Sequence, residues 1–225
     1  AIPSSVGAAP VQNIGAYGAE AKDAISVVEY FDTNKLEVVR LKNEECSFAY
    51  RESVFKHELK GEAIILAVEF ELHRTAKPNL GYGDVIKEVE ARGGATLKNI
   101  REAICAIRAS KLPDPKVLGN AGSFFKNPIV GAGVAEALLK EYPEMPKYPV
   151  PNSSDKVKLA AGWLIDKAGL KGYRSGSVGV HERQALVLVN HGGATGDDVI
   201  RLSEMVCGAV KAKFGIEISP EVNIL

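Results

Sequence analysis

The sequence around one serine, Ser123, is of a kind that could hold a reactive hydroxyl group in a fixed position. Ser123 lies in GNAGSFFKNP, residues 119–128, between glycines and a bulky, basic tail that ends in proline. Two prolines in the preceding KLPDPK, residues 111–116, restrict the backbone, so the approach to Ser123 is stiff. A nucleophilic role with His181 is one option, but GNAGSFF does not match the GxSxG elbow, and no acid partner can be assigned. A tight interdomain turn with glycines at positive φ explains the decapeptide equally well.

Two charged residues with apolar or aromatic neighbours are further candidates. Arg51 follows Tyr50 in FAYRESVFK, residues 48–56. Burying an arginine without an anionic partner is costly, so Arg51 either extends to solvent or faces a carboxylate or phosphate. Glu221 follows Pro220 in SPEVNIL, where apolar neighbours could desolvate its carboxyl, although a glutamate so near the C-terminus is often simply exposed.

Other motifs are weaker or absent. The segment PVQNIGAYG, residues 10–18, has glycines and a tyrosine where the backbone could approach a flat ligand, but it could equally be structural. The sequence has no GxxxxGK(S/T) loop, and GAGVAE, residues 131–136, lacks the third glycine of a dinucleotide fingerprint. The four histidines have no metal-ligand spacing, so no metal site is predicted.

The composition indicates a globular protein without nucleic-acid or membrane partners. In 225 residues, 28 basic and 28 acidic side chains cancel, and like charges do not form long runs. The sequence lacks an apolar run long enough to span a bilayer and a signal peptide, so we expect a cytoplasmic protein. Cys46, Cys105 and Cys207 lack CxxC spacing and are expected to be buried thiols. Because the chain starts in a Gly-, Pro- and Ser-rich loop, we expect that an N-terminal portion precedes it.

The hydrophobic pattern predicts two α+β units joined near Leu112. Residues 25–30 and 36–41 should form a hairpin, residues 63–72 a long strand, and residues 184–190 a short buried strand. Helices are expected after Thr96 and at residues 134–142, 157–168 and 197–214. Thr195 and Asp198 should cap the last of these helices, which Gly215 should end.

Seven segments together resemble one protein family. They are, in order, PVQNIGAYGAE, FAYRESVFKHE, GYGD, KLPDPKVLGNAGSFFKNP, VKLAAGWLID, HERQALVLVN and SPEV. This set is similar to the type I UDP-N-acetylenolpyruvoylglucosamine reductases, the MurB family, and the match runs from Ala1 to about Val222. The resemblance implies a monomeric flavoenzyme of peptidoglycan precursor synthesis. In this chemistry NADPH reduces FAD, and the reduced flavin then reduces the enolpyruvyl ether of a UDP-sugar.

The resemblance also implies roles for the three candidate residues. Hydride adds to the outer carbon of the enolpyruvyl double bond and leaves negative charge that spreads into the adjacent carboxylate. Arg51 and Glu221 would flank that carboxylate, and Ser123 would deliver a proton to the neighbouring carbon. Because a serine hydroxyl is a weak acid, groups such as Lys111 or Asn127 would have to stabilise its alkoxide.

Binding residues are implied by the same resemblance. Tyr82, the type I mark in the GYGD loop, would lie near the diphosphate with Lys111 and Asn127. Tyr50 is also expected at the substrate, and the uridine would contact Tyr148, Lys171 and Gln184. Residues expected at FAD are Ile2, Pro3, Ser5, Gly7, Val11, Asn13, Ile14, Gly15 and Arg108.

The implied fold is α+β with two domains. Residues 1–112 would be the second half of an FAD-binding domain of the vanillyl-alcohol-oxidase type, residues 113–219 a smaller substrate-binding domain, and residues 220–225 a segment that returns to the flavin site. The family's N-terminal segment, with its GSN-containing loop for the FAD diphosphate, is absent, so we expect these residues alone to hold FAD weakly or not at all. Asn223 and the pair Ser4 and Ser5 also depart from the family's usual residues.

Two other functions remain open at this stage. One is a non-catalytic module that binds a UDP-sugar or a flavin. The other is an oxidoreductase of the same broad fold with a different substrate, which the fold alone does not exclude.

Overall fold

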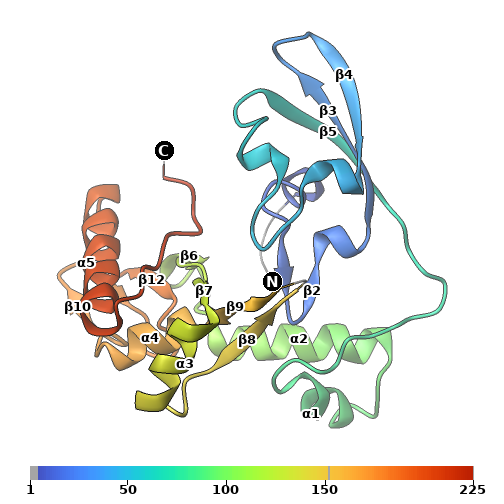
Figure 1. The fold of residues 1–225 in the computed structure, drawn as a ribbon. Coiled ribbons are helices and arrows are strands. Elements are labelled where there is room, and N and C mark those ends of the chain that lie inside the picture. Colours follow the sequence, from blue (N-terminus) through green and yellow to red (C-terminus); the bar gives the residue numbers. More distant parts are fainter. Residues whose placement is uncertain (1–4, 152, 225) are drawn as a thin grey trace. The chain divides into compact units, whose positions relative to one another are not determined.

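The computed structural model describes residues 5–151 and 153–224 and combines helices with antiparallel sheets (Figure 1). The α+β fold class predicted from the sequence is confirmed. The chain divides into two compact units, Ala1–Arg108 and Ala109–Leu225, each of which has its own core. Assignment of these units to flavin and substrate binding remains a prediction. Among the described residues, none of the helices has the length and apolar character needed to cross a membrane.

A three-stranded antiparallel sheet forms one half of the first unit. Its order is β4 (Glu37–Lys42), β3 (Ile25–Asp32) and β5 (Ala63–Phe70). The predicted hairpin and long strand are therefore confirmed. Val28 and Tyr30 on one face of β3 pack with Cys46 and Phe55 into an apolar cluster, which gives the adjoining loops a firm base.

Two helices form the second cluster of the first unit. They are α1 (Val85–Glu90) and α2 (Leu97–Lys111), and α2 confirms the helix predicted after Thr96. Val89 and Ile107 are buried between the helices, and Tyr17 packs against the same cluster. The short elements of this unit are β1 (Gly15–Ala16), β2 (Ala19–Glu20) and the 3-10 helices η1 (Val6–Ala8), η2 (Ala21–Asp23), η3 (Asn43–Cys46) and η4 (Val54–Lys56).

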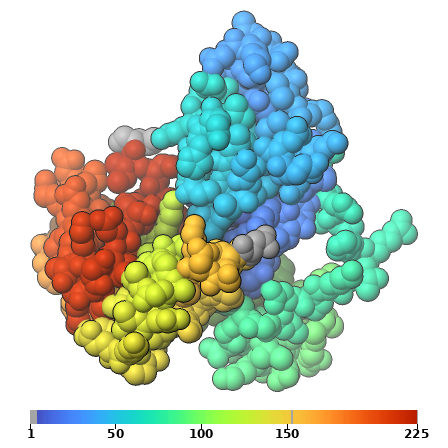
Figure 2. All heavy atoms as spheres, viewed as in Figure 1, coloured from blue at the N-terminus to red at the C-terminus, as the bar shows by residue number. Residues whose placement is uncertain are grey.

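An exposed connection joins β5 to α1 in the first unit. Residues 71–79 are all exposed, and Figure 2 shows this stretch, in green-blue, as a projecting chain. At its end, Asn79 Nδ2 donates a hydrogen bond to the carbonyl of Gly18 at 3.0 Å. The GYGD loop that follows is thus fastened to the turn at Tyr17 and Gly18.

The described residues of the second unit form two antiparallel sheets and three helices. One sheet has the order β10 (Arg174–Ser175), β11 (Val178–Val180), β12 (Val187–Asn190) and β6 (Gly119–Ser123), and the other has β7 (Ile129–Gly131), β9 (Ser153–Leu159) and β8 (Lys147–Val150). The helices are α3 (Ala132–Glu141), α4 (Ala161–Lys167) and α5 (Gly196–Phe214). An apolar cluster that includes Phe125, Leu164, Leu188 and Val206 packs α5 against the first sheet and α4 against α5, while α3 contacts β7 and β9 of the other sheet.

The ends of α5 follow the capping signals in the sequence. Thr195 and Asp198 form the predicted capping box, in which each side chain accepts from the other's amide. Gly215 ends the helix with φ 67°, in the left-handed conformation that glycine adopts without strain. The two signals place both boundaries of this helix correctly.

Three local predictions are wrong. Residues 157–159 belong to β9 and not to a helix, because Val157 pairs with Val130 on one side and Pro149 on the other. The predicted strand at residues 184–190 is restricted to Val187–Asn190. Of the three cysteines only Cys46 is fully buried, while Cys105 and Cys207 are partly exposed.

Candidate functional site

Ser123 is the exposed last residue of β6. It pairs with Val187 of β12, so this part of the decapeptide is a strand and not a turn. Gly122, immediately before it, has φ 75°, which a larger side chain would adopt only with strain. Phe124 and Phe125, immediately after it, are 6% and 1% exposed and anchor the chain in the core. The hydroxyl is therefore held at the surface by strand pairing before it and core packing after it.

The C-terminal segment brings Glu221 beside this strand. The amide of Glu221 donates to the carbonyl of Phe124 at 2.7 Å, and the amide of Lys126 donates to the carbonyl of Ser219 at 2.9 Å. Phe125 and Pro220 form the bridge between these two bonds. The second unit thus joins two of the predicted reactive residues, Ser123 and Glu221, through backbone pairing.

Asn127 and Gln184 have firm internal contacts in the second unit. Asn127 Oδ1 accepts from the Ala161 amide at 2.9 Å at the start of α4, which orients the side-chain amide. Gln184 Oε1 lies 3.4 Å from the Leu186 amide. A Cβ at Gly162 would lie only 3.3 Å from that same oxygen, so glycine is what allows the Gln184 turn to approach α4.

Tyr148 and Lys158 face the same side of the β8–β9 pair. They are register partners, and Lys158 Nζ lies 5.9 Å from the centroid of the Tyr148 ring. Lys158 was not among the predicted binding residues, because this stretch was assigned to a helix. The alternating pattern of Lys156, Val157 and Lys158 was the signal that would have identified it as a strand residue.

Lys111 and Lys171, the two lysines predicted to bind substrate, are exposed. Lys171 forms an ion pair with Asp166 at 3.0 Å between Nζ and Oδ2. Lys111 is the last residue of α2. Neither is a core residue, so both could rearrange toward an anionic ligand.

In the first unit, Arg51 occupies a tight turn with an uncommon backbone conformation. The Ala49 and Glu52 main chains exchange hydrogen bonds of 3.0 and 3.2 Å across it. Arg51 has φ 59°, which costs a non-glycine residue free energy. Its Nη2 donates to the carbonyl of Gly15 at 2.6 Å, and its Cζ lies 5.1 Å from the centroid of the Tyr50 ring. The two alternatives predicted from the sequence, extension to solvent or an anionic partner, included neither of these contacts, and an anionic partner from a ligand stays a prediction.

The segment predicted to approach the flavin folds as a compact loop around Asn13. Asn13 is fully buried, and its side chain contacts Glu20, Lys22 and Ala49. A Cβ at Gly15 would lie 2.7 Å from the carbonyl oxygen of Ala19, so this position requires glycine for packing alone. Val11, Ile14 and Gly7 are partly buried, and Ser5 is exposed. Ile2 and Pro3, also predicted to bind the cofactor, lie outside the described residues.

Tyr82 and Arg108 lie next to this loop in the same unit. The Tyr82 and Tyr17 rings meet edge to face, with centroids 5.8 Å apart, and Tyr82 remains 41% exposed. Burial raises the pKa of Tyr17, and the positive charge of Arg108 partly opposes that rise. The first unit therefore collects Tyr82, Arg108 and, through Gly15, Arg51 around residues 10–18.

Arg108 provides a direct test of whether the residues suit an anionic cofactor. Its Nε is buried and has no hydrogen-bond partner among the described residues. A buried guanidinium donor without a partner is costly, and a ligand phosphate would satisfy it. This property fits the diphosphate of a dinucleotide cofactor such as FAD.

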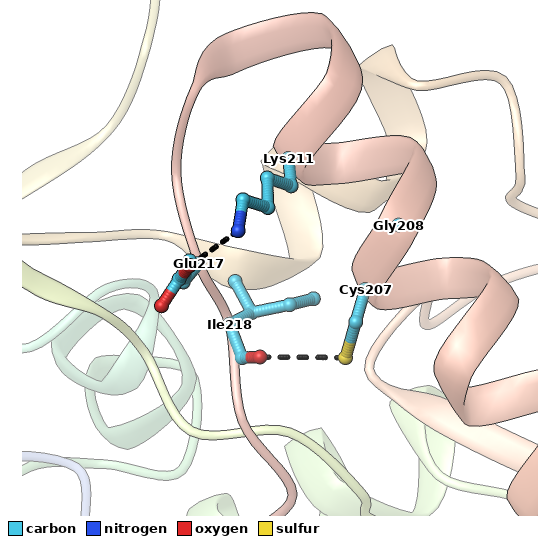
Figure 3. A pocket seen from close by; sticks show the side chains of 5 residues that line it. All are labelled: Cys207, Gly208, Lys211, Glu217 and Ile218. Atoms are coloured by element: carbon cyan, nitrogen blue, oxygen red, sulfur yellow. Dashed lines mark hydrogen bonds and ion pairs between the residues drawn. The ribbon is translucent and has the colours of Figure 1, made fainter.

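Other features of the second unit are structural. Figure 3 shows an open pocket between α5 and the following chain, lined by Cys207, Gly208, Lys211, Glu217 and Ile218. Lys211 points toward Glu217, with 2.6 Å between Nζ and Oε1, and Cys207 Sγ contacts the carbonyl of Ile218 at 3.3 Å. These contacts hold the chain that leads to Glu221. In the described part of the chain, His, Cys, Asp and Glu residues do not form a cluster that could hold a metal ion.

Comparison with known proteins identifies the family. A model of the "UDP-N-acetylenolpyruvoylglucosamine reductase, C-terminal domain" matches residues 114–225. A UDP-N-acetylenolpyruvoylglucosamine reductase from Bacteroides fragilis is 50% identical over 224 residues, which cover 100% of this chain and 67% of that protein. The chain belongs to the UDP-N-acetylenolpyruvoylglucosamine reductase (MurB) family. The resemblance seen in the sequence motifs is therefore confirmed.

Further members of the MurB family show the same relationship. Reductases of that name from Chromobacterium violaceum and Neisseria meningitidis are 55% and 54% identical to the whole chain. The chain spans 66% and 65% of the length of these two curated relatives, that is, about two thirds. A crystal structure of MurB from Thermus caldophilus covers 99% of the chain at a TM-score of 0.62 and 26% identity, and the chain covers 60% of that structure.

Proposed function

We propose that this 225-residue chain forms the substrate-binding and proton-donating part of a reductase. The reductase would convert UDP-N-acetylglucosamine enolpyruvate to UDP-N-acetylmuramate with NADPH and FAD. The observation that carries the proposal is the backbone pairing of residues 124–126 with residues 219–221, which bonds Glu221 to Phe124, the residue after Ser123. MurB membership supplies the reaction, because the relatives carry the reductase name. A module that only binds a UDP-sugar would not require both a hydroxyl and a carboxyl group held by the same pairing of two chain segments.

The cofactor would be held mainly by the first unit. Arg108 would bind its diphosphate through the buried Nε, and the loop at residues 10–18 would provide backbone contacts. When bound, FAD would supply hydride from NADPH to the outer carbon of the enolpyruvyl double bond. Residues of this chain would then stabilise the negative charge that develops on the substrate and donate the proton.

Arg51 and Glu221 would act on the substrate carboxylate, where negative charge develops. A guanidinium fixed by the Gly15 carbonyl and the Tyr50 ring would already be oriented before the charge forms, so little reorganisation would be needed. Ser123 would donate its proton to the carbon next to the carboxylate, which completes addition of one hydride and one proton across the double bond. Lys111 or Asn127 would stabilise the alkoxide that remains.

The nucleotide would bind through aromatic and amide groups. In the second unit, Tyr148 offers a ring and Lys158 a positive charge on the same side of one sheet. Gln184 and Lys171 would contact the uridine, and Asn127 the diphosphate through its oriented amide. Tyr82 would close over the diphosphate from the end of the exposed segment 71–79. A soluble monomer in the cytoplasm would fit this biosynthetic reaction.

Two half-reactions test the proposal in a full-length reductase, meaning a chain of the relatives' length that contains these residues. Ser123→Ala should leave reduction of bound FAD by NADPH intact and abolish reoxidation of the flavin by the UDP-enolpyruvyl sugar. Stopped-flow absorbance of the flavin separates the two steps. Reoxidation at the unsubstituted rate in Ser123→Ala would remove Ser123 from the reaction. Flavin that stays reduced with the sugar in the unsubstituted protein would refute the proposed function.

A further inference from the structure

Three hydrogen bonds from side chains connect the loop at residues 9–16 with the turn at residues 49–53. Asn13 Nδ2 donates to the carbonyl of Ala49 at 2.9 Å. Arg51 Nη2 donates to the carbonyl of Gly15 at 2.6 Å, and Ser53 Oγ donates to the carbonyl of Val11 at 2.5 Å. One donor, Asn13, lies in the loop and two, Arg51 and Ser53, lie in the turn, so a shift of either segment would break these bonds.

Two of the three donor side chains, Asn13 and Ser53, are more deeply buried than Arg51. Asn13 is 0% and Ser53 is 1% exposed. Burying such polar groups is favourable only when their hydrogen bonds are made, which makes these two contacts obligatory in the folded state. The third donor, Arg51, is only partly buried, and it is the residue proposed to contact substrate.

The side-chain amide of Asn13 is used fully within the protein. One hydrogen bond from Nδ2 goes to Glu20 Oε2 at 3.0 Å and another to Ala49, while Oδ1 accepts from the Lys22 amide at 2.9 Å. These three bonds employ both amide hydrogens and the oxygen. The Asn13 side chain is therefore committed to the protein, which leaves its backbone as the part that could contact a cofactor.

The Arg51 turn needs such support because its backbone conformation is unfavourable. Arg51 has φ 59°, and Lys56 Nζ donates to its carbonyl at 3.0 Å. Ser53 also accepts from the Phe55 amide at 3.2 Å, which joins the turn to η4 and to the buried ring of Phe55. The turn is thus held from the loop side by Asn13 and from the core side by Ser53.

We propose that Asn13 and Ser53 are positioning residues that hold the guanidinium of Arg51 in its working orientation. They act through the Ala49 and Val11 carbonyls and do not themselves touch the substrate. This inference rests on the proposed function for its catalytic consequence, but its structural core concerns the Arg51 turn alone. A displacement of about 1 Å in a catalytic group can reduce turnover by roughly 100-fold, so loss of either contact should affect kcat.

Substitutions can remove these contacts while preserving the local backbone. Asn13 has φ 46°, which aspartate tolerates, so Asn13→Asp can keep the backbone conformation while it removes the donors to Ala49 and to Glu20. Ser53→Ala removes the hydroxyl, and Ser53→Thr retains it. Asn99→Asp is the matched control, because Asn99 Nδ2 donates to the carbonyls of Arg92 and Gly94, both at 2.8 Å, in the turn between α1 and α2.

Amide hydrogen exchange of Ala49 and Glu52, measured by NMR on the 225-residue chain, tests the structural core. Exchange should become roughly tenfold faster in Asn13→Asp and Ser53→Ala, as expected for loss of one hydrogen bond, and should stay unchanged in Asn99→Asp. Ser53→Thr should restore slow exchange. Unchanged exchange in Asn13→Asp and Ser53→Ala, or an equal increase in Asn99→Asp, would overturn the inference.

Kinetics of the full-length reductase test the catalytic consequence. Asn13→Asp and Ser53→Ala should lower kcat between roughly tenfold and 100-fold with little change in KM, while Asn99→Asp should leave both near the unsubstituted values. Equal kcat in all variants would also overturn the positioning role. An unsubstituted enzyme without reductase activity would refute the proposed function, and the exchange result would then decide separately whether the two residues hold the turn.

Discussion

The amide of Glu221 donates a hydrogen bond of 2.7 Å to the carbonyl of Phe124, the residue that follows Ser123 in the chain. This bond belongs to the backbone, so the position of residue 221 does not depend on the glutamate side chain. Phe124 and Phe125 are buried in the first of the two paired segments. Ile216 and Ile218, which precede the second segment in the chain, are buried as well. The core of the second unit therefore fixes the backbone of residue 221 next to Phe124, although the two segments are far apart in the sequence.

Two substitutions of Glu221 should separate its backbone and side-chain contributions. Glu221→Pro removes the donor to Phe124 and should reduce the free energy of unfolding by about 1–3 kcal/mol, because a carbonyl next to the core loses its partner. Glu221→Gln keeps that bond, so it should destabilise the protein less. Under the proposed function it should act mainly on flavin reoxidation by the UDP-enolpyruvyl sugar in the full-length reductase. Urea denaturation measures the first effect and stopped-flow kinetics the second. Equal destabilisation by both substitutions would contradict the backbone role.

Arg51 should show a conflict between stability and function. Its φ of 59° is unfavourable for any residue with a Cβ, whereas glycine adopts it freely. Arg51→Gly and Arg51→Ala both remove the guanidinium, so under the proposed function both should lose flavin reoxidation in the full-length reductase. The glycine variant should nevertheless be more stable than the alanine variant by about 1 kcal/mol, as measured by urea denaturation. If alanine is as stable as glycine here, the turn does not store strain.

Gly15 should tolerate no larger residue. In Gly15→Ala the new Cβ would meet the carbonyl oxygen of Ala19 at 2.7 Å and Glu20 Cγ at 2.9 Å, so the β1–β2 hairpin must deform. We expect a loss of about 1–3 kcal/mol and a shift of the Arg51 contact, seen as a lower melting temperature and faster amide exchange at residues 49–52. Gly208→Ala is the contrasting variant, because its Cβ would meet nothing within 4 Å on α5. It should raise stability by about 1 kcal/mol, and a loss there would contradict this account of glycine packing.

Local signals in the sequence were sufficient for elements that follow a single rule. The α5 helix has a capping pair, an apolar stripe and a terminal glycine, and both of its ends were predicted correctly. The β3–β4 hairpin was predicted because two β-rich runs flank a short polar loop. In each case the chemistry that determines the element lies within that element.

Contacts between distant segments could not be predicted from local pattern. Residues 157–159 were predicted to start a helix, but pairing with β7 and β8 makes them a strand. The position of Lys158 beside Tyr148 was therefore not predicted. Likewise, Asn13 was assigned to the cofactor, while its side chain is used by Glu20, Lys22 and Ala49, of which Ala49 is distant in the chain. The backbone bond between Glu221 and Phe124 could not be found from composition or periodicity, which carry no information about such pairing.

Acid should weaken α5 through the single carboxylate of its capping box. Asp198 accepts from the Thr195 amide and hydroxyl, both at 2.8 Å, and from Arg201 at 2.6 Å, and these bonds lower its pKa from 3.8 to about 2. A carboxyl whose pKa is lower in the folded state stabilises the protein above its unfolded pKa, and that contribution disappears as pH falls through the folded pKa. Stability from this group should therefore be complete above about pH 4 and be lost between about pH 4 and pH 2.

Asp198→Asn tests this assignment against Asp197→Asn, which removes the same charge from the same helical turn. The free energy of unfolding, followed by circular dichroism from neutral to acidic pH, should be lower for Asp198→Asn than for the unsubstituted protein at neutral pH. The difference should shrink as the pH approaches 2, because the native carboxyl is then protonated as well. Asp197→Asn should show a smaller and flatter difference, since only the interaction with the helix dipole is lost. A deficit in Asp198→Asn that stays constant down to pH 2 would show that its cause is not the ionised cap.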